Sequence, residues 1–167
     1  MRTWSSVFPS GEVFAAMGMI HTTADLVDEI VPNRARYYLL EQGQLRNAPP
    51  VDNSYKWAGG GFLSTSEDLV RFGFAHLRPQ LLKPETVTLL WTSQQTTAGE
   101  EVGYGIGWRV GTDDQGRPWI GHNGGSVGGS TQLRIYPESK LVVSIISNLS
   151  AVSYGKLADQ LHDLFDD

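Results

Sequence analysis

The sequence predicts an α+β fold in which helices come first and an antiparallel sheet with a closing helix follows. Three observations support this order. Helix-start signals and loop residues dominate the first 100 residues, short strand-like segments separated by turns follow, and the last segment returns to helical spacing. At 167 residues the chain is long enough for one domain with a core. We therefore expect helices and loops over 1–100 and a sheet with a C-terminal helix over 101–167.

The first elements are short. Ser10 can cap a helix over 12–17, which Gly18 would end. Residues 36–40 and 44–46 predict a small hairpin about Gln42-Gly43. Prolines disfavour helix before them, so the stretch 48–53 is expected to be an extended loop.

Clear helix signals follow. Ser64 and Glu67 stand at the reciprocal positions of a capping box, ahead of apolar residues and His76 at helical spacing. Pro84 suits the first turn of a second helix, whose inner face would hold the apolar residues Val87, Leu90 and Trp91.

The second half predicts four strands, at 104–110, 117–122, 130–136 and 140–147, with a turn at 113–116. In the last strand, apolar residues occupy both alternation classes, which is typical of a central strand buried on both faces. A closing helix over 153–165 would follow, with Ser153 as its N-cap and an inner stripe of leucines, Leu157, Leu161 and Leu164.

Composition argues against several functional classes. The 13 basic and 18 acidic residues give a net charge of −5, without the basic stripe of a nucleic-acid-binding protein. The absence of cysteine excludes disulfides, cysteine nucleophiles and thiolate metal sites. No apolar run has membrane-spanning length, and the first residues lack the apolar region of a signal peptide. The four histidines show no ligand spacing, and Gly59–Gly61 lacks the Lys-Ser/Thr of a P-loop. We expect neither metal nor cofactor.

The most informative segment is the polar, glycine-dense run from Gly121 to Ser130, which lies between two strand-like segments. Glycine lets backbone N–H groups approach a bound group closely, because no side chain intervenes. A strand edge that carries His122 and ends in glycines could therefore form one wall of an active site. The same pattern also fits a glycine-rich hairpin in which these residues only form the turn.

Several motifs resemble one family in order and spacing from about Phe14 onward. They are Val51-Asp52-Asn53-Ser54-Tyr55-Lys56-Trp57-Ala58-Gly59-Gly60-Gly61-Phe62-Leu63-Ser64-Thr65, Leu82-Lys83-Pro84-Glu85-Thr86-Val87, Trp91-Thr92, Tyr104-Gly105-Ile106-Gly107-Trp108, His122-Asn123-Gly124-Gly125 and Val142-Val143-Ser144-Ile145-Ile146. Together they resemble the serine β-lactamase-like proteins, whose superfamily includes class C β-lactamases, penicillin-binding DD-peptidases and related esterases. The resemblance covers only the C-terminal half of that fold, so the chain is expected to be a single partial domain.

The resemblance implies amide or ester hydrolysis through an acyl-serine. Family members use Ser-x-x-Lys, Tyr-x-Asn and Lys/His-x-Gly. His122 and Gly124 match the third motif, and Gly125 would donate its N–H to the oxyanion. Asn123 and Ser126 would contact a small amide or ester substrate. This sequence has no Tyr-x-Asn, and no Ser-x-x-Lys precedes the matched region. We therefore expect a truncated, split or frame-disrupted member that is inactive alone.

Two other motifs leave an alternative open. Ser153-Tyr154-Gly155-Lys156 matches Ser-x-x-Lys, and Gly124–Gly128 matches the Gly-x-Ser-x-Gly elbow around Ser126. Ser153 is more simply a helix cap. The segment after Ser126 alternates like a strand, whereas an elbow needs a helix there. Asp159, His162 and Asp163 are interpreted as a solvated helix face.

Three hypotheses remain: the C-terminal portion of a serine hydrolase, a non-catalytic binding or assembly module derived from the fold, and an intact small hydrolase using Ser126 or Ser153. The resemblance also implies that elements completing the sheet beside strand 140–147 are missing. This strand is then expected to pair with the missing half or to self-associate. A bacterial member would function in the cell envelope or periplasm, but the sequence leaves the compartment open.

Overall fold

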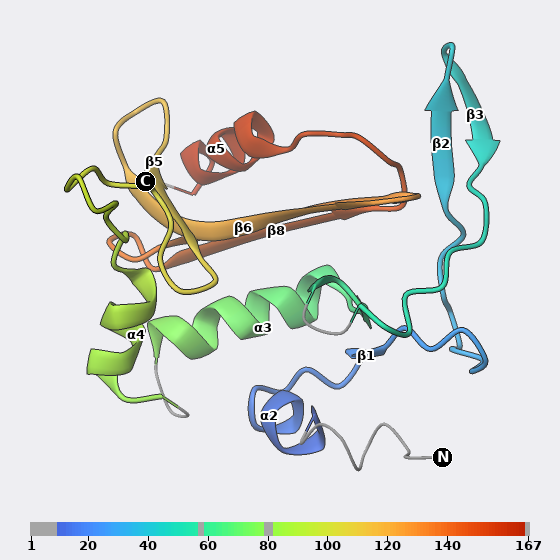
Figure 1. Ribbon diagram of the computed structural model, residues 1–167, viewed down its shortest axis with the longest axis horizontal. Helices are drawn as coiled ribbons and strands as arrows, with labels where there is room; N and C mark the ends of the chain where they lie inside the picture. Colours follow the sequence, from blue (N-terminus) through green and yellow to red (C-terminus); the bar gives the residue numbers. More distant parts are fainter. Residues whose placement is uncertain (1–9, 57–58, 79–81, 166–167) are drawn as a thin grey trace.

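The central element of the computed structural model, which describes residues 10–56, 59–78 and 82–165, is an antiparallel four-stranded sheet. Its strands are β5 (Arg109–Thr112), β6 (Pro118–Ser126), β7 (Gly129–Tyr136) and β8 (Leu141–Ser147), which lie side by side in chain order. Such a meander needs only short turns between neighbours. The α+β prediction is confirmed (Figure 1).

Helices cover both faces of this sheet (Figure 1). On one face, α3 (Ser66–Leu77) and α4 (Pro84–Trp91) pack on a core that includes Trp108, Ile120 and Ile135. The opposite face carries α5 (Gly155–Asp163), which contributes Ala158 to a second apolar cluster with Tyr136 and Val143. The predicted packing of Val87, Leu90 and Trp91 is confirmed, since Val87 is buried and the other two contact the first core.

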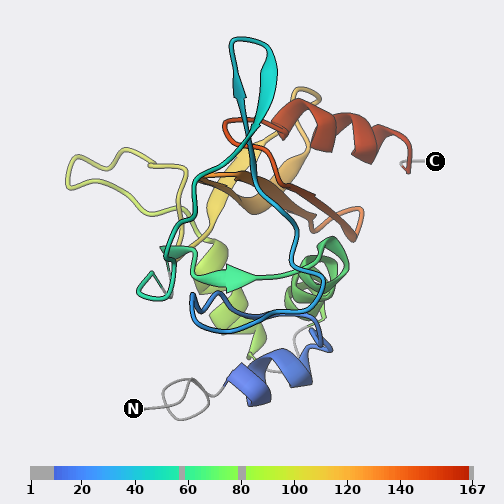
Figure 2. The same ribbon diagram turned by 90° about the vertical axis from the view of Figure 1, so that its right-hand side faces the viewer.

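The remaining elements are small. Helix α2 (Ser10–Ala16) ends before Gly18, which has a φ of 71°. Strand β1 (Thr23–Ala24) pairs with β4 (Phe62–Leu63). The predicted hairpin is confirmed as β2 (Tyr38–Glu41) and β3 (Gln44–Asn47), and it extends away from the body of the molecule (Figure 2).

The N-terminal cap of α3 differs from the prediction by one residue. Thr65, not Ser64, is the N-cap, and its Oγ1 accepts a hydrogen bond from the Asp68 N–H at 3.1 Å. The position three residues after the cap is therefore held by Asp68 rather than by Glu67. Ser64 and Thr65 stand next to each other and offer two possible cap positions, and the tertiary contacts of Asp68 accompany the one that forms.

Asp68 lies fully buried and joins the N-terminal segment to α3. Its carboxylate accepts hydrogen bonds at 2.8 Å from the His21 N–H and the Thr22 hydroxyl, and it pairs with Arg71. Burial opposes ionisation of this group, but the hydrogen bonds from Thr22, His21 and Arg71 outweigh it and lower the pKa of Asp68. The contact fixes the segment that precedes β1.

Two strand boundaries differ from the prediction. The first strand of the sheet begins at Arg109 rather than at residue 104, because Gly103 and Gly107 have φ values of 65° and 79° and the chain turns there. Conversely, β6 continues to Ser126, so the glycine-dense run is mostly strand. The turn itself comprises Val127 and Gly128, where Gly128 has a φ of 76° and Tyr37 leaves no room for a side chain.

The interpretation of 140–147 as a central strand is wrong for the sheet that the described residues form. Helices cover both faces of β8, which accounts for its two apolar alternation classes, yet β8 lies at the edge of the sheet. Within the described part of the chain, no strand pairs with its outer side.

The closing helix is shorter than predicted and rotated. Tyr154 is its N-cap position, without a side-chain cap, so Ser153 does not cap it. Leu157 and Leu164 are 42% and 72% exposed, whereas Ala158 and His162 are buried. Of the predicted stripe only Leu161 packs inward. No helix in the described residues has the length and apolarity needed to cross a membrane.

Candidate active site

The candidate site lies on the second half of β6, where the strand has an open edge. Strand β5 pairs with β6 only from Pro118 to Gly121, whereas β7 accompanies it to Ser126. Residues from His122 to Ser126 are exposed. The structure places His122, Gly124 and Gly125 along this edge, with Asn123 and Ser126 on the same strand.

The register determines which backbone groups face this edge. The Asp113 N–H donates to the Arg117 carbonyl at the start of the β5–β6 ladder, so the backbone groups of Gly121 face β5 and those of His122 face β7. Alternation continues along the strand without a bulge. The N–H of Gly125 therefore points to the open edge and is not used in the ladder with β7.

His122 contacts Tyr104, which lies in the turn segment that precedes β5. The Tyr104 hydroxyl is 2.7 Å from His122 Nε2, and their rings meet edge to face with centroids 5.8 Å apart. On the other side of the imidazole, Nδ1 lies 2.7 Å from the Asn123 carbonyl oxygen. Tyr104 formed part of the resemblance, but sequence alone gave it no site role. Only the turn that places it beside β6 could have identified it.

The two glycines differ in what surrounds them. A side chain at Gly124 would come within 2.6 Å of the Thr131 hydroxyl, whereas one at Gly125 would meet nothing within 4 Å. Gly124 is thus needed for packing against β7. Space above Gly125 is open to a bound group.

Ser153 lies on the other face of the sheet from His122. It lines a cavity of about 220 Å³ together with Asn123, Gln132 and Tyr154. Asn123 and Gln132 are directly paired across β6 and β7, so their side chains share this face, while His122 alternates to the α3 face. Lys156 does not line this cavity, and the arrangement gives Ser153 no base.

Ser126 does not occupy a nucleophile elbow. It ends strand β6, and the two-residue turn leads into strand β7 rather than into a helix. The elbow places its serine on a strand-to-helix turn. The strand interpretation of the segment after Ser126 is therefore confirmed.

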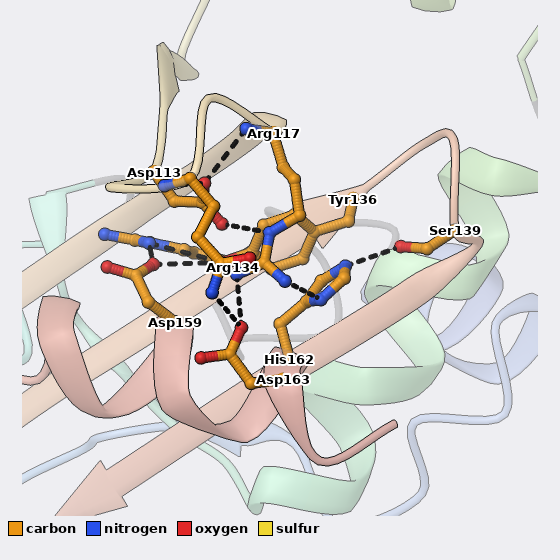
Figure 3. Close-up of polar contacts among 9 residues, drawn as sticks. Asp113, Arg117, Arg134, Tyr136, Ser139, Asp159, His162 and Asp163 are labelled. Atoms are coloured by element: carbon orange, nitrogen blue, oxygen red, sulfur yellow. Dashed lines mark hydrogen bonds and ion pairs between the residues drawn. The ribbon is translucent and has the colours of Figure 1, made fainter. Parts of the chain in front are cut away.

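A second polar cluster lies under α5 (Figure 3) and corrects the prediction of a solvated helix face for Asp159 and His162, whereas Asp163 is exposed as expected. His162 is only 1% exposed, and Asp159 pairs with Arg134, whose guanidinium also covers the Trp119 ring. Asp163 pairs with Arg117 at 2.7 Å. Sequence spacing did place these residues on neighbouring turns, but the facing arginines come from β7 and the β5–β6 turn.

Charge pairing shifts the pKa values in this cluster. Burial opposes ionisation of Asp113, but hydrogen bonds from the Arg117 backbone and side chain outweigh it and lower the pKa of Asp113. Burial also weighs against the charge of Arg117, yet Asp113 and Asp163 raise the pKa of this guanidinium. Burial, with the Asp113 charge, raises the pKa of Tyr136. The cluster connects three segments at one end of the sheet.

The serine and histidine of this cluster do not form a nucleophile and base. His162 Nε2 lies 2.8 Å from the Ser139 hydroxyl, while Nδ1 lies 2.7 Å from Arg117 Nη1. Arginine only donates, so Nδ1 must accept and the ring proton stands on Nε2. His162 then donates to Ser139 and cannot remove its proton. The contact is structural.

Among the described residues, no group of three or more histidine, aspartate or glutamate side chains could hold a metal ion. Trp108 is buried in the core, as expected for this residue, whereas Trp57 lies outside the described residues. The chemistry of the site therefore has to be sought in His122, Tyr104 and the backbone of β6.

Comparison with known proteins identifies relatives over most of the chain. Residues 6–165 match the β-lactamase family. The human mitochondrial serine β-lactamase-like protein LACTB is 34% identical over 194 residues, which cover 93% of this chain and 36% of LACTB. Penicillin-binding protein 4 of Amycolatopsis lactamdurans is 31% identical, with 81% of this chain and 39% of that protein covered. The chain thus spans less than half the length of these relatives.

Solved structures show the same fold. The octameric penicillin-binding protein homologue from Pyrococcus abyssi superposes with a TM-score of 0.76 at 23% identity, covering 93% of this chain and 36% of that one. A penicillin-binding protein from Bacillus halodurans gives 0.74 at 24% identity, with 93% and 48% covered. The D-amino acid amidase from Ochrobactrum anthropi gives 0.72 at 21% identity, with 92% and 47% covered.

Proposed function

The chain belongs to the β-lactamase family of serine hydrolases, and from this premise we propose that it forms the strand side of an acyl-serine site that hydrolyses an amide or an ester. The observation that carries the proposal is the open edge of β6, where the unused N–H of Gly125 lies three residues after the exposed His122. The serine and its base would come from a segment with Ser-x-x-Lys, which this sequence does not supply before the matched region.

In this role Gly125 would stabilise the tetrahedral intermediate. Hydrolysis through an acyl-serine places negative charge on the former carbonyl oxygen, and a fixed backbone N–H stabilises that charge without reorganising. Because no neighbour lies within 4 Å of the Gly125 side-chain position, an acyl group can approach the strand there. His122, Tyr104 and Ser126 lie toward the α3 face of this edge and Asn123 toward the α5 face, so the substrate would lie along the edge between them, in contact with Asn123 and Ser126.

The test combines this chain with a separately expressed N-terminal segment of the family that carries Ser-x-x-Lys. Gly125→Pro removes the N–H at a position where no ladder bond is lost, and Gly125→Ala keeps it. We expect Gly125→Pro to lower p-nitrophenyl ester hydrolysis by about a hundredfold or more, with Gly125→Ala changing it little. Equal rates for the two variants would remove Gly125 from the site.

The chain alone should neither hydrolyse nitrocefin or a p-nitrophenyl ester above a His122→Ala control nor react with a fluorophosphonate, since an oxyanion donor without a nucleophile has no intermediate to stabilise. Turnover or labelling that disappears in Ser126→Ala or Ser153→Ala would instead establish the small-hydrolase alternative.

An assembly role is favoured by the outer edge of β8. Its backbone groups lack a partner strand in the described residues, and Ile146 is 37% exposed beside that edge. We propose that strand 140–147 pairs with the other half of the family's fold or with a second copy. Light scattering at micromolar concentration should show association that Ile146→Lys weakens and the control Leu89→Lys, on an exposed face of α4, does not. A monomer that unfolds cooperatively would refute this role.

A further inference from the structure

The Tyr104 side chain is held beside β6 by a rigid turn. The Gln94 N–H donates to the Tyr104 carbonyl, and the Ile106 N–H donates to the Leu90 carbonyl, both at 2.9 Å. Between them, Gly105 lies so close to the Leu90 carbonyl that a side chain would come within 2.2 Å of it. The turn is therefore fixed to the end of α4, and a fixed support is what a positioning side chain requires.

The partners of His122 determine where its protons stand. The Asn123 carbonyl oxygen can only accept, so Nδ1 must carry a hydrogen in order to bond with it. In a neutral imidazole the other nitrogen is then bare. Nε2 consequently accepts, and the Tyr104 hydroxyl donates to it. Both ring nitrogens are engaged by groups of this chain.

We infer that Tyr104 is a positioning residue of the candidate site, which holds His122 in the Nδ1–H tautomer with Nε2 as the proton acceptor. The hydroxyl oxygen of Tyr104 keeps lone pairs, whereas His122 has no further N–H to offer. A ligand group that meets this pair is therefore a hydrogen-bond donor, such as an amide N–H or a hydroxyl, and not a carboxylate.

The catalytic meaning of this role rests on the proposed function, whereas the tautomer can be measured on this chain alone. A long-range ¹H–¹⁵N correlation spectrum of the histidine-labelled chain, at a pH where the imidazoles are neutral, distinguishes the two tautomers directly. His122→Gln assigns the signals. We expect Nδ1–H for His122 and, as an internal reference, Nε2–H for His162.

Replacing Tyr104 by phenylalanine keeps the ring and removes the donor. One neutral hydrogen bond corresponds to about a three- to tenfold change in an equilibrium, so the ratio of Nδ1–H to Nε2–H at His122 should fall by that factor. The control Tyr55→Phe, at a side chain that is 71% exposed, should leave the ratio unchanged. His162 should keep its tautomer in both variants.

An Nε2–H tautomer at His122 in the wild type, or the same ratio in Tyr104→Phe, would overturn the assignment. Circular dichroism shows whether Tyr104→Phe is folded. If it is not, 3-fluorotyrosine provides the second test, because its more acidic hydroxyl must shift the His122 resonances, and no shift overturns the role. The spectra test the tautomer, and the two-chain assay tests ester hydrolysis. A chain that shows the expected tautomer but supports no hydrolysis would therefore contradict the proposed function and not the role of Tyr104.

Discussion

His122 on β6 and His162 on α5 lie on opposite faces of one sheet, and each hydrogen-bonds through both ring nitrogens, yet their surroundings give them opposite chemistry. His122 is exposed, and a carbonyl on Nδ1 makes Nε2 an acceptor. His162 is buried, and Arg117 on Nδ1 makes Nε2 a donor. The partner of Nδ1 thus decides whether a histidine beside a hydroxyl can act as a base. Proximity of a serine or tyrosine alone does not.

The largest expected contrast is in stability. His162→Ala removes a buried ring and leaves Ser139 and Arg117 without this partner, so the free energy of unfolding should fall by about 2–4 kcal/mol. His122→Ala, at an exposed position, should stay within about 0.5 kcal/mol of the wild type. Urea denaturation measures both. Similar losses at the two sites would mean that His122 is part of the folded core.

A smaller difference in the free energy of unfolding is expected between variants of the two hydroxyl partners, Ser139 and Tyr104. Ser139→Ala removes the hydrogen bond between the Ser139 hydroxyl and the buried His162 Nε2 and should cost about 1–2 kcal/mol of unfolding free energy. Tyr104→Phe removes a hydrogen bond at an exposed site and should cost no more than about 0.5 kcal/mol. Thermal and urea unfolding of the pair would sharpen the distinction. A larger loss for Tyr104→Phe than for Ser139→Ala would reverse it.

The smallest expected effect is a change in how steeply the free energy of unfolding depends on pH, and it concerns a third histidine. His76 lies buried against Trp108 and donates from Nδ1 to the Phe72 carbonyl. Burial lowers the pKa of His76 below 6.5, and the bond to Phe72 only partly offsets this. Between the folded and unfolded pKa values the unfolded chain binds more protons. The free energy of unfolding should therefore decrease as the pH falls below about 6.5. Above that pH, His76 is neutral in both states and should not reduce it.

Urea unfolding at a series of pH values would measure this slope. His76→Leu, which keeps an apolar side chain in the core, should flatten the curve between about pH 5 and 7. An unchanged slope in His76→Leu would assign the acid sensitivity to other groups, such as the paired carboxylates of Asp68 and Asp113.

Local signals in the sequence determined much of the fold. Pro84 begins α4 as its fixed φ favours, Gln42-Gly43 forms the tight turn of a hairpin, and Gly18 ends α2. The order of helices, meander and closing helix followed from periodicity. Each of these depends on interactions within a few residues, which the sequence displays directly.

The predictions that the structure corrected depend on contacts between distant segments rather than on local signals. The turn at Gly103 and Gly107 and the strand character of Gly121–Ser126 depend on which neighbour each segment meets, because glycine accepts either conformation. The rotation of α5 follows from Arg117 and Arg134, which draw His162 and Asp159 inward in place of Leu157. An apolar stripe is a weak guide when buried charge pairs compete for the same face.

The sequence by itself determined that this chain is an α+β member of the β-lactamase family, with His122 and Gly124 matching a family motif that Gly125 follows, because that information lies in residue types at fixed spacings. Only the tertiary structure decided that β5 stops short of His122, that the Gly125 N–H faces an open edge, and that Tyr104 meets the imidazole. These features arise from register and from turns that bring residues 18 positions apart into contact, and no local pattern specifies them.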